Sequence, residues 1–205
     1  MKKILILLAM LVWTNMAIGL TAEKKSVGNM APDPGIEQWT QAIRQNADDP
    51  VSFYGRGKAY YNKKQFDAAI KDFTRALELK PAYGNAFLWR AWAYDELGQE
   101  EAALNDYSQA IICNPFLEAA YIERAEIFFK RGMYDLAAGD CRRAIQNNQE
   151  MARAYFTQGL VFEQQGLYPE AINSYKVLTE KFAGREDALV NAAKARITAL
   201  RGVGK

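Results

Sequence analysis

The sequence contains no histidine and only two cysteines, Cys113 and Cys141. Without histidine, the chain lacks the side chain most often used as a general base, as the activator of a nucleophile and as a metal ligand. Two cysteines are too few for a disulfide framework, and they have no metal-binding spacing. No glycine-rich phosphate loop follows a predicted strand. These absences argue against an enzyme, and nothing indicates a cofactor or a metal site.

The sequence also lacks an excess of either charge, with 26 Lys and Arg residues against 24 Asp and Glu residues. A nucleic-acid-binding protein is expected to carry a basic excess or a basic stripe, and neither is visible. Half of the residues are hydrophobic, so the chain has enough apolar surface to bury a core. We therefore expect a folded protein that binds no nucleic acid.

Long apolar runs are absent except near the N-terminus. Two lysines precede an apolar run from Ile4 to Trp13, and small and polar residues follow it. This order is typical of a secretory signal peptide over residues 1–22, with cleavage after Gly19 or Ala22. The alternative is an uncleaved membrane anchor, although Asn15 interrupts the run before it reaches the roughly 20 residues that span a bilayer. We expect an exported protein, periplasmic or secreted, and less favourably one anchored in the inner membrane and facing the periplasm.

A 34-residue repeat fills most of the chain, and the segments 50–83, 84–117, 118–151 and 152–185 align without a gap. The recurring columns are Phe53, Phe87, Tyr121 and Tyr155 at repeat position 4; Gly57, Ala91, Ala125 and Gly159 at position 8; Tyr60, Tyr94, Phe128 and Phe162 at position 11; Ala69, Ala103, Ala137 and Ala171 at position 20; Phe73, Tyr107, Cys141 and Tyr175 at position 24; and Ala76, Ala110, Ala144 and Leu178 at position 27. Positions 4, 8 and 11 share one stripe of a helix, as do positions 20, 24 and 27. Each repeat therefore predicts two antiparallel helices.

Breaks between the helices support this interpretation. Gly98, Gly132 and Gly166 all fall at position 15, where they suit the C-terminus of a first helix. Pro81 and Pro115 occupy position 32 of the first two repeats. The whole pattern resembles the tetratricopeptide repeat (TPR) family, whose W-x2-L-G-x2-Y and A-x3-F pattern is seen in all four repeats and whose Pro is present in the first two.

The resemblance implies an all-α fold, an α-solenoid of four TPR helix-turn-helix repeats. Two shorter helical patterns flank the repeats and predict capping helices at both ends, which hide the last core faces of a solenoid. The expected organisation is a signal peptide at 1–22, a flexible tail at 23–32, an N-terminal capping helix at 33–49, the four repeats at 50–83, 84–117, 118–151 and 152–185, and a C-terminal capping helix and tail at 186–205.

Two polar columns depart from the family pattern. Position 7 holds Arg56, Arg90 and Arg124 and then Gln158, and position 23 holds Asp72, Asp106 and Asp140 and then Ser174. Because the two columns change together in the fourth repeat, we predict an Arg–Asp pair between the two helices of each of the first three repeats. The alternative is two solvated columns.

In the family that the chain resembles, about positions 2, 5, 9, 12 and 13 of the first helices line a concave groove. The peptide-binding residues expected here are Tyr54, Lys58, Tyr61, Leu88, Trp92, Ile122, Glu126, Phe129, Arg153, Phe156 and Leu160. Most are apolar and none is needed for the core of its own repeat, so we expect an exposed apolar stripe, which usually marks a binding site. The alternative is that some of them pack against neighbouring helices.

These residues predict the type of partner. Arg153 alone suits a carboxylate, so an apolar segment or an amphipathic helix is the expected ligand, with Glu126 and Glu163 meeting a basic residue on it. We therefore predict a protein-protein interaction scaffold or adaptor that organises a cell-envelope complex and binds proteins or peptides. The alternative is a self-associating structural scaffold, and contact with a membrane is expected only if the leader is retained.

The leader predicts where the mature chain begins. If it is a signal peptide, mass spectrometry or Edman sequencing of the exported protein should find Leu20 or Glu23 at the N-terminus. Recovery of Met1 in membrane-bound protein would identify the segment as an anchor instead.

Overall fold

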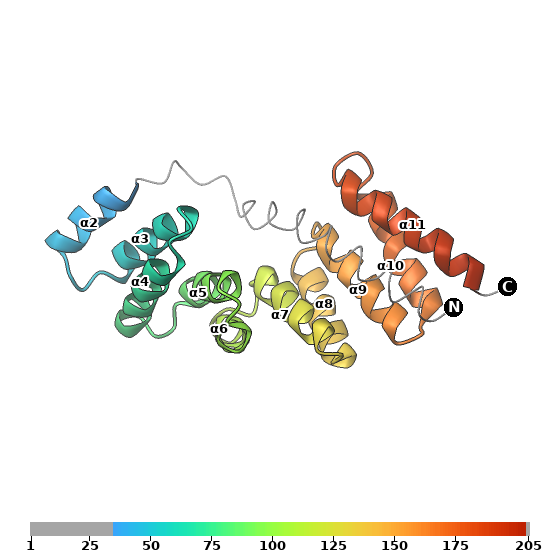
Figure 1. Ribbon diagram of the computed structural model, residues 1–205, viewed down its shortest axis with the longest axis horizontal. Helices are drawn as coiled ribbons and strands as arrows, with labels where there is room; N and C mark the ends of the chain where they lie inside the picture. The colour runs from blue at the N-terminus through green and yellow to red at the C-terminus, as the bar shows by residue number, and fades with distance from the viewer. Residues whose placement is uncertain (1–34, 204–205) are drawn as a thin grey trace. The chain divides into compact units, whose positions relative to one another are not determined.

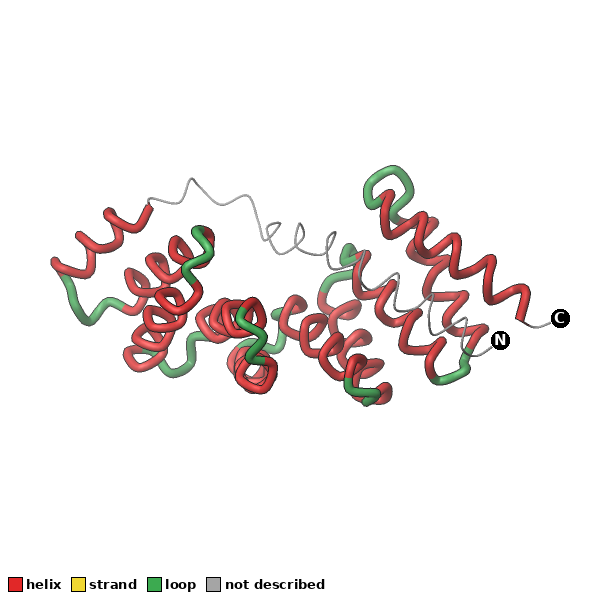
Figure 2. Tube along the Cα trace, viewed as in Figure 1, coloured by secondary structure: helices red, strands yellow, loops and turns green. Residues whose placement is uncertain are grey.

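The computed structural model describes residues 35–203. This part of the chain is built from helices joined by short loops and contains no strand (Figure 2). The helices are α2 (Gly35–Gln45), α3 (Pro50–Asn62), α4 (Phe66–Leu79), α5 (Gly84–Glu96), α6 (Glu100–Cys113), α7 (Glu118–Lys130), α8 (Tyr134–Asn147), α9 (Ala152–Gln164), α10 (Tyr168–Lys181) and α11 (Asp187–Val203). The all-α solenoid of helical repeats is thus confirmed.

The helices from α3 to α10 form four pairs, α3–α4, α5–α6, α7–α8 and α9–α10, and each pair contacts the next (Figure 1). A residue in the left-handed backbone region separates the two helices of every pair. Gly98, Gly132 and Gly166 have φ values of 70°, 72° and 76°, and Lys64 takes the same place in the first pair with φ 59°. Glycine adopts this conformation without a steric penalty, whereas Lys64, which has a Cβ atom, adopts it with backbone strain.

The small residues at position 8 let the two helices of a pair approach closely. A Cβ atom added to Gly57 would lie 2.6 Å from the ring of Phe73, and one added to Gly159 would meet the ring of Tyr175. The predicted columns at positions 20, 24 and 27 are fully buried in all four pairs. The contact between the two helices of a pair is therefore made by small residues on both helices that fit around one larger side chain.

The predicted Arg–Asp pairs are present in the first three repeats. Arg90 bonds with Nε and Nη2 to both oxygens of Asp106, at 2.6 and 2.9 Å, and Arg56–Asp72 and Arg124–Asp140 have the same two-bond geometry. The aspartates are buried. The hydrogen bond to Asp72 raises the pKa of Arg56.

Each of these arginines also contacts the helix immediately before its own, which the sequence did not predict. The Nη1 atoms of Arg56, Arg90 and Arg124 donate to hydroxyl oxygens of Thr40, Thr74 and Ser108, at 3.3, 2.9 and 3.1 Å. One guanidinium group therefore joins three helices: its own, the second helix of its pair and the helix immediately before its own in the chain.

The end helices pack on the array as capping helices. Trp39 of α2 lies against the backbone of α3 at Gly55, where an added Cβ atom would overlap its ring. Helix α11 buries Val190, Ala193, Ile197 and Leu200, while Leu189 is only half-buried. The sequence pattern places Leu189, Ala193, Ile197 and Leu200 on the apolar face of this helix, and in the structure Val190 takes the place of the first of them.

Overpacking of the small core positions tests this register. Ala103 at position 20 is completely buried, so Ala103→Leu should lower the free energy of unfolding by about 1–3 kcal/mol. Ala102→Leu is the matched control, because Ala102 is only partly buried and the chain itself carries an exposed leucine, Leu136, at the same repeat position. Urea denaturation that finds equal losses for both variants would contradict the assigned register.

Candidate functional site

The predicted binding residues all lie on α3, α5, α7 and α9, the first helices of the four pairs. We call the surface at positions 2, 5, 9, 12 and 13 of these helices the first-helix face. Helix α3 contacts α5 and α7 contacts α9, so the face crosses the boundaries between pairs. Five of the predicted residues are partly exposed on it: Tyr54, Lys58, Tyr61, Glu126 and Phe129. Six are buried: Leu88, Trp92, Ile122, Arg153, Phe156 and Leu160.

The expectation that the apolar residues form an exposed stripe is wrong for the buried ones. Trp92 is 1% exposed and Phe156 is 0% exposed. Leu88 and Trp92 belong to a core cluster that also includes Ile127 of the next pair. These side chains pack across the boundary between pairs, so truncating them removes core contacts. Binding of a partner at this face stays a prediction.

An aromatic cluster lies at the α3–α5 end of the face. Trp89 packs edge-on against Trp92 and Tyr61, with ring centroids 5.0 and 5.4 Å apart. The Nζ atom of Lys58 lies 5.0 Å from the centroid of the Trp89 ring, a cation–π contact. Trp89 was missed in the sequence because its column at position 6 reads Gly55, Trp89, Glu123 and Thr157, which shows no common residue type.

A buried ionic cluster joins α7 and α9. Arg153 donates from both Nη atoms to the two oxygens of Glu123, each at 2.9 Å, and from Nε to Glu126 at 2.8 Å. The expectations that Arg153 suits a partner's carboxylate and that Glu126 meets a basic residue of a ligand are therefore corrected, since the two groups bind each other. Breaking a buried pair of this kind typically costs about 3–5 kcal/mol, because one charge is left without a partner.

Glu163 has a similar internal role. It accepts hydrogen bonds from the Tyr175 hydroxyl at 2.7 Å and from Nη1 of Arg196 at 3.1 Å. Burial raises the pKa of this carboxyl group. Because Arg196 lies on α11, Glu163 connects the C-terminal capping helix to the last pair. The expectation that Glu163 meets a basic residue of a ligand is therefore corrected.

Two buried donors near the face have no hydrogen-bond partner among the described residues, the Nε1 atom of Trp92 and the hydroxyl of Tyr107. Both belong to the same core cluster of the second pair. Burial raises the pKa of Tyr107, and the charges of Glu123 and Asp95 raise it further. A buried donor without an acceptor is unusual and calls for an explanation.

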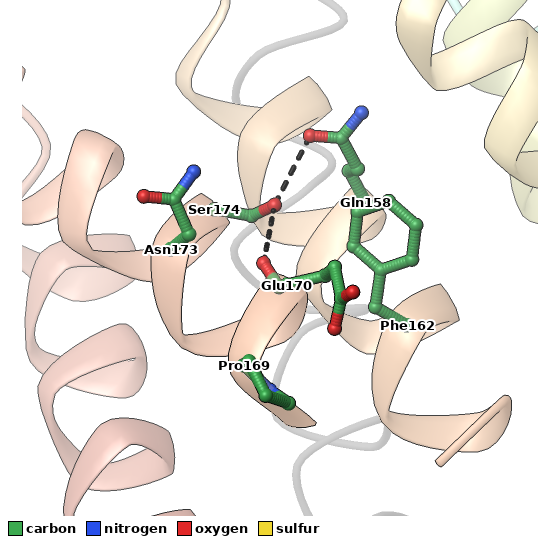
Figure 3. A pocket seen from close by; sticks show the side chains of 6 residues that line it. All are labelled: Gln158, Phe162, Pro169, Glu170, Asn173 and Ser174. Carbon is green, nitrogen blue, oxygen red and sulfur yellow. Dashed lines mark hydrogen bonds between the residues drawn. The ribbon is translucent and has the colours of Figure 1, made fainter. Parts of the chain in front are cut away.

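A pocket of about 480 Å³ lies away from the first-helix face, between α9 and α10 (Figure 3). Its lining residues are Gln158, Phe162, Pro169, Glu170, Asn173 and Ser174. The Ser174 hydroxyl lies 3.1 Å from Oε1 of Gln158 and 3.1 Å from the carbonyl oxygen of Glu170 (Figure 3). Gln158 and Ser174 are the two residues that stand in the Arg and Asp columns of this pair.

A family described as the tetratricopeptide repeat protein 21 C-terminal ARM domain matches residues 41–190, most of the chain. The chain belongs to this family. A search of the curated proteins finds no match.

Solved structures of other TPR proteins have the same fold as this TPR array. A crystal structure of MamA is 23% identical with a TM-score of 0.66, and the match covers 71% of this chain and 85% of that one. YrrB, described as a TPR protein with an unusual peptide-binding site, is 20% identical with a TM-score of 0.68 over 78% of this chain and 84% of that one. The first TPR domain of Spaghetti (RPAP3), bound to the HSP90 peptide SRMEEVD, is 20% identical with a TM-score of 0.55 over 58% and 94%.

Other kinds of site find little support in the described part of the array. Residues 35–203 hold no cluster of His, Cys, Asp and Glu side chains arranged for a metal ion. Cys141 is a free, buried thiol whose pKa burial raises, and this makes it a poor nucleophile. Among the same residues, no helix combines the length and the hydropathy that a bilayer crossing requires.

Burial on the first-helix face predicts which substitutions damage the TPR array. Trp92→Ala should lower the free energy of unfolding by about 3–5 kcal/mol, because it removes a large buried side chain. Phe129→Ala, at a half-buried position of the same face, should cost clearly less. Thermal or urea denaturation measures both, and a Trp92→Ala variant as stable as the wild type would contradict the packing described here.

Proposed function

We propose that the chain is a protein-interaction scaffold whose first-helix face receives an apolar segment or an amphipathic helix of a partner protein. Membership of a TPR family and likeness to TPR proteins, one of them bound to a peptide, support a scaffold that acts by binding and not by catalysis. The predicted leader supports a place outside the cytoplasm, where the scaffold would organise a cell-envelope complex.

The observation that carries this proposal is the group of partly exposed aromatic rings on the face, Tyr54, Tyr61 and Phe129. These rings would supply apolar contacts to a bound segment, in the way that aromatic anchors act at the centre of an interface. The unpartnered donors of Trp92 and Tyr107 are fully buried and take no part in this contact.

Two variants test the two ends of the face. Tyr61→Ala removes a partly exposed ring on α3 and should weaken binding by about tenfold. Phe129→Ala removes a partly exposed ring and should weaken binding by about tenfold or more. The measurement is capture of partners from the native envelope fraction, followed by the Kd of the purified partner, with a thermal melt to show that each variant is folded.

Phe116→Ala is the matched control, because Phe116 is 75% exposed in the loop between α6 and α7, off the first-helix face. Capture should be unchanged in this variant. Wild-type capture by both Tyr61→Ala and Phe129→Ala would overturn the assignment of the face.

The second candidate function is a self-associating scaffold. It is favoured by two large exposed apolar side chains at the α6–α7 connection, Ile112 at 70% and Phe116 at 75% exposure. Native mass spectrometry over a range of protein concentrations distinguishes the candidates. Oligomers that dissociate in Phe116→Ala would support self-association, whereas a concentration-independent monomer would exclude it.

A further inference from the structure

The described helix pairs contain three guanidinium-binding sites that the chain's own arginines fill. In each of the first three pairs, the guanidinium bonds to the aspartate at position 23 and lies near the aromatic ring at position 11, and in the first two pairs it also lies near the ring at position 4. The Cζ atom of Arg90 lies 5.5 Å from the centroid of the Phe87 ring and 5.9 Å from that of Tyr94, and Arg56 lies 5.7 and 5.8 Å from Phe53 and Tyr60. These sites show which chemistry this position of a pair accepts.

The fourth pair keeps the aromatic part of the site but supplies no guanidinium. Tyr155 and Phe162 occupy positions 4 and 11 and are both partly exposed. Gln158 replaces the arginine with a shorter, uncharged side chain that lies 3.1 Å from Ser174. The pocket of about 480 Å³ opens at this place and is lined by Phe162, Gln158 and Ser174.

The acidic residue of this pair stands one helical turn earlier on the second helix than the aspartates of the first three pairs. Position 19 holds Ala68, Ala102 and Leu136 in the first three repeats, and Glu170 in the fourth. Glu170 lines the pocket together with Phe162 (Figure 3). Thus the fourth pair lacks the aspartate at position 23 but carries a carboxylate four residues earlier on the same helix, so the pocket keeps an acidic group.

We propose that the pocket between α9 and α10 is a guanidinium-binding site that takes an arginine side chain of a partner protein. The guanidinium plane lies over the Phe162 ring, pairs with the Glu170 carboxylate and donates to the amide oxygens of Gln158 and Asn173. Arginine fits this site better than lysine, because a planar guanidinium stacks on an aromatic face and donates in several directions. The site is separate from the first-helix face and does not depend on the function proposed for that face.

Arg142 is the group that opposes this binding. It stands at the repeat position of Thr40, Thr74 and Ser108, whose hydroxyls accept from the arginines of the first three pairs. Its side chain is exposed, and its charge repels a second cation. A single arginine should therefore bind weakly. Removing the charge of Arg142 should strengthen the binding of a cation and weaken the binding of an anion, so a substitution of Arg142 reports the charge of the ligand.

The experiment uses N-acetyl-L-arginine methylamide as the probe, with the matching citrulline and lysine compounds for comparison. Binding is followed by the NMR signals of the side-chain amides of Gln158 and Asn173 in the purified chain. The arginine probe should shift both signals in a saturable way, citrulline should leave them unshifted, and lysine should bind more weakly. Equal shifts with citrulline would overturn the proposal, since the site would then not recognise charge.

Three variants complete the test. Glu170→Gln should weaken binding of the arginine probe by about threefold or more, and Arg142→Thr, which restores the hydroxyl found in the other pairs, should tighten it. The double variant Gln158→Arg with Ser174→Asp rebuilds the chain's own ion pair, so it should melt no lower than the wild type and lose binding, read at Asn173. Tighter binding in Glu170→Gln together with weaker binding in Arg142→Thr would identify an anion site, and unchanged binding in the folded double variant would place the probe elsewhere.

Discussion

Each helix pair depends on the contact between a glycine or alanine on its first helix and a larger buried side chain on its second. At Gly57 the ring of Phe73 fills the place where a Cβ atom would be, and at Gly159 the ring of Tyr175 does the same. This contact brings the helices close enough for an arginine on one to reach an aspartate on the other. It also leaves little room inside a pair, so larger side chains at the next positions are buried against neighbouring pairs.

Most of the fold is predictable because every core requirement occurs four times. A column of alanines such as Ala69, Ala103, Ala137 and Ala171 identifies a close helix contact more firmly than one alanine does, and all four are completely buried. The Arg–Asp pairs were predictable for a related reason, since Gln158 and Ser174 replace both partners in the same repeat. A simultaneous change at two distant positions indicates physical contact.

The first-helix face was predicted less well than the core of each pair. The repeat positions describe contacts within one helix pair, whereas the burial of a residue on this face also depends on the neighbouring pair. Trp92 is not needed inside its own pair, yet it packs in a cluster that includes Ile127 of the next. Glu123 and Trp89 share position 6, where the four residues have no common property, so no pattern pointed to their contacts. The partners of Arg153 are 27 and 30 residues away and not one repeat away, which hides them from a column-by-column comparison.

The arginine hydrogen bonds between neighbouring pairs involve the second helices at the first two junctions and the first helices at the third. At the first two junctions between repeats, Arg90 and Arg124 hold the second helices together through Thr74 and Ser108. At the third junction, Gln158 and Arg142 do not provide this connection, and Arg153 holds first helix to first helix through Glu123 and Glu126. The array is therefore expected to be mechanically uneven, because the arginine-mediated bonds resist a bending force at the second helices of the first two junctions and at the first helices of the third.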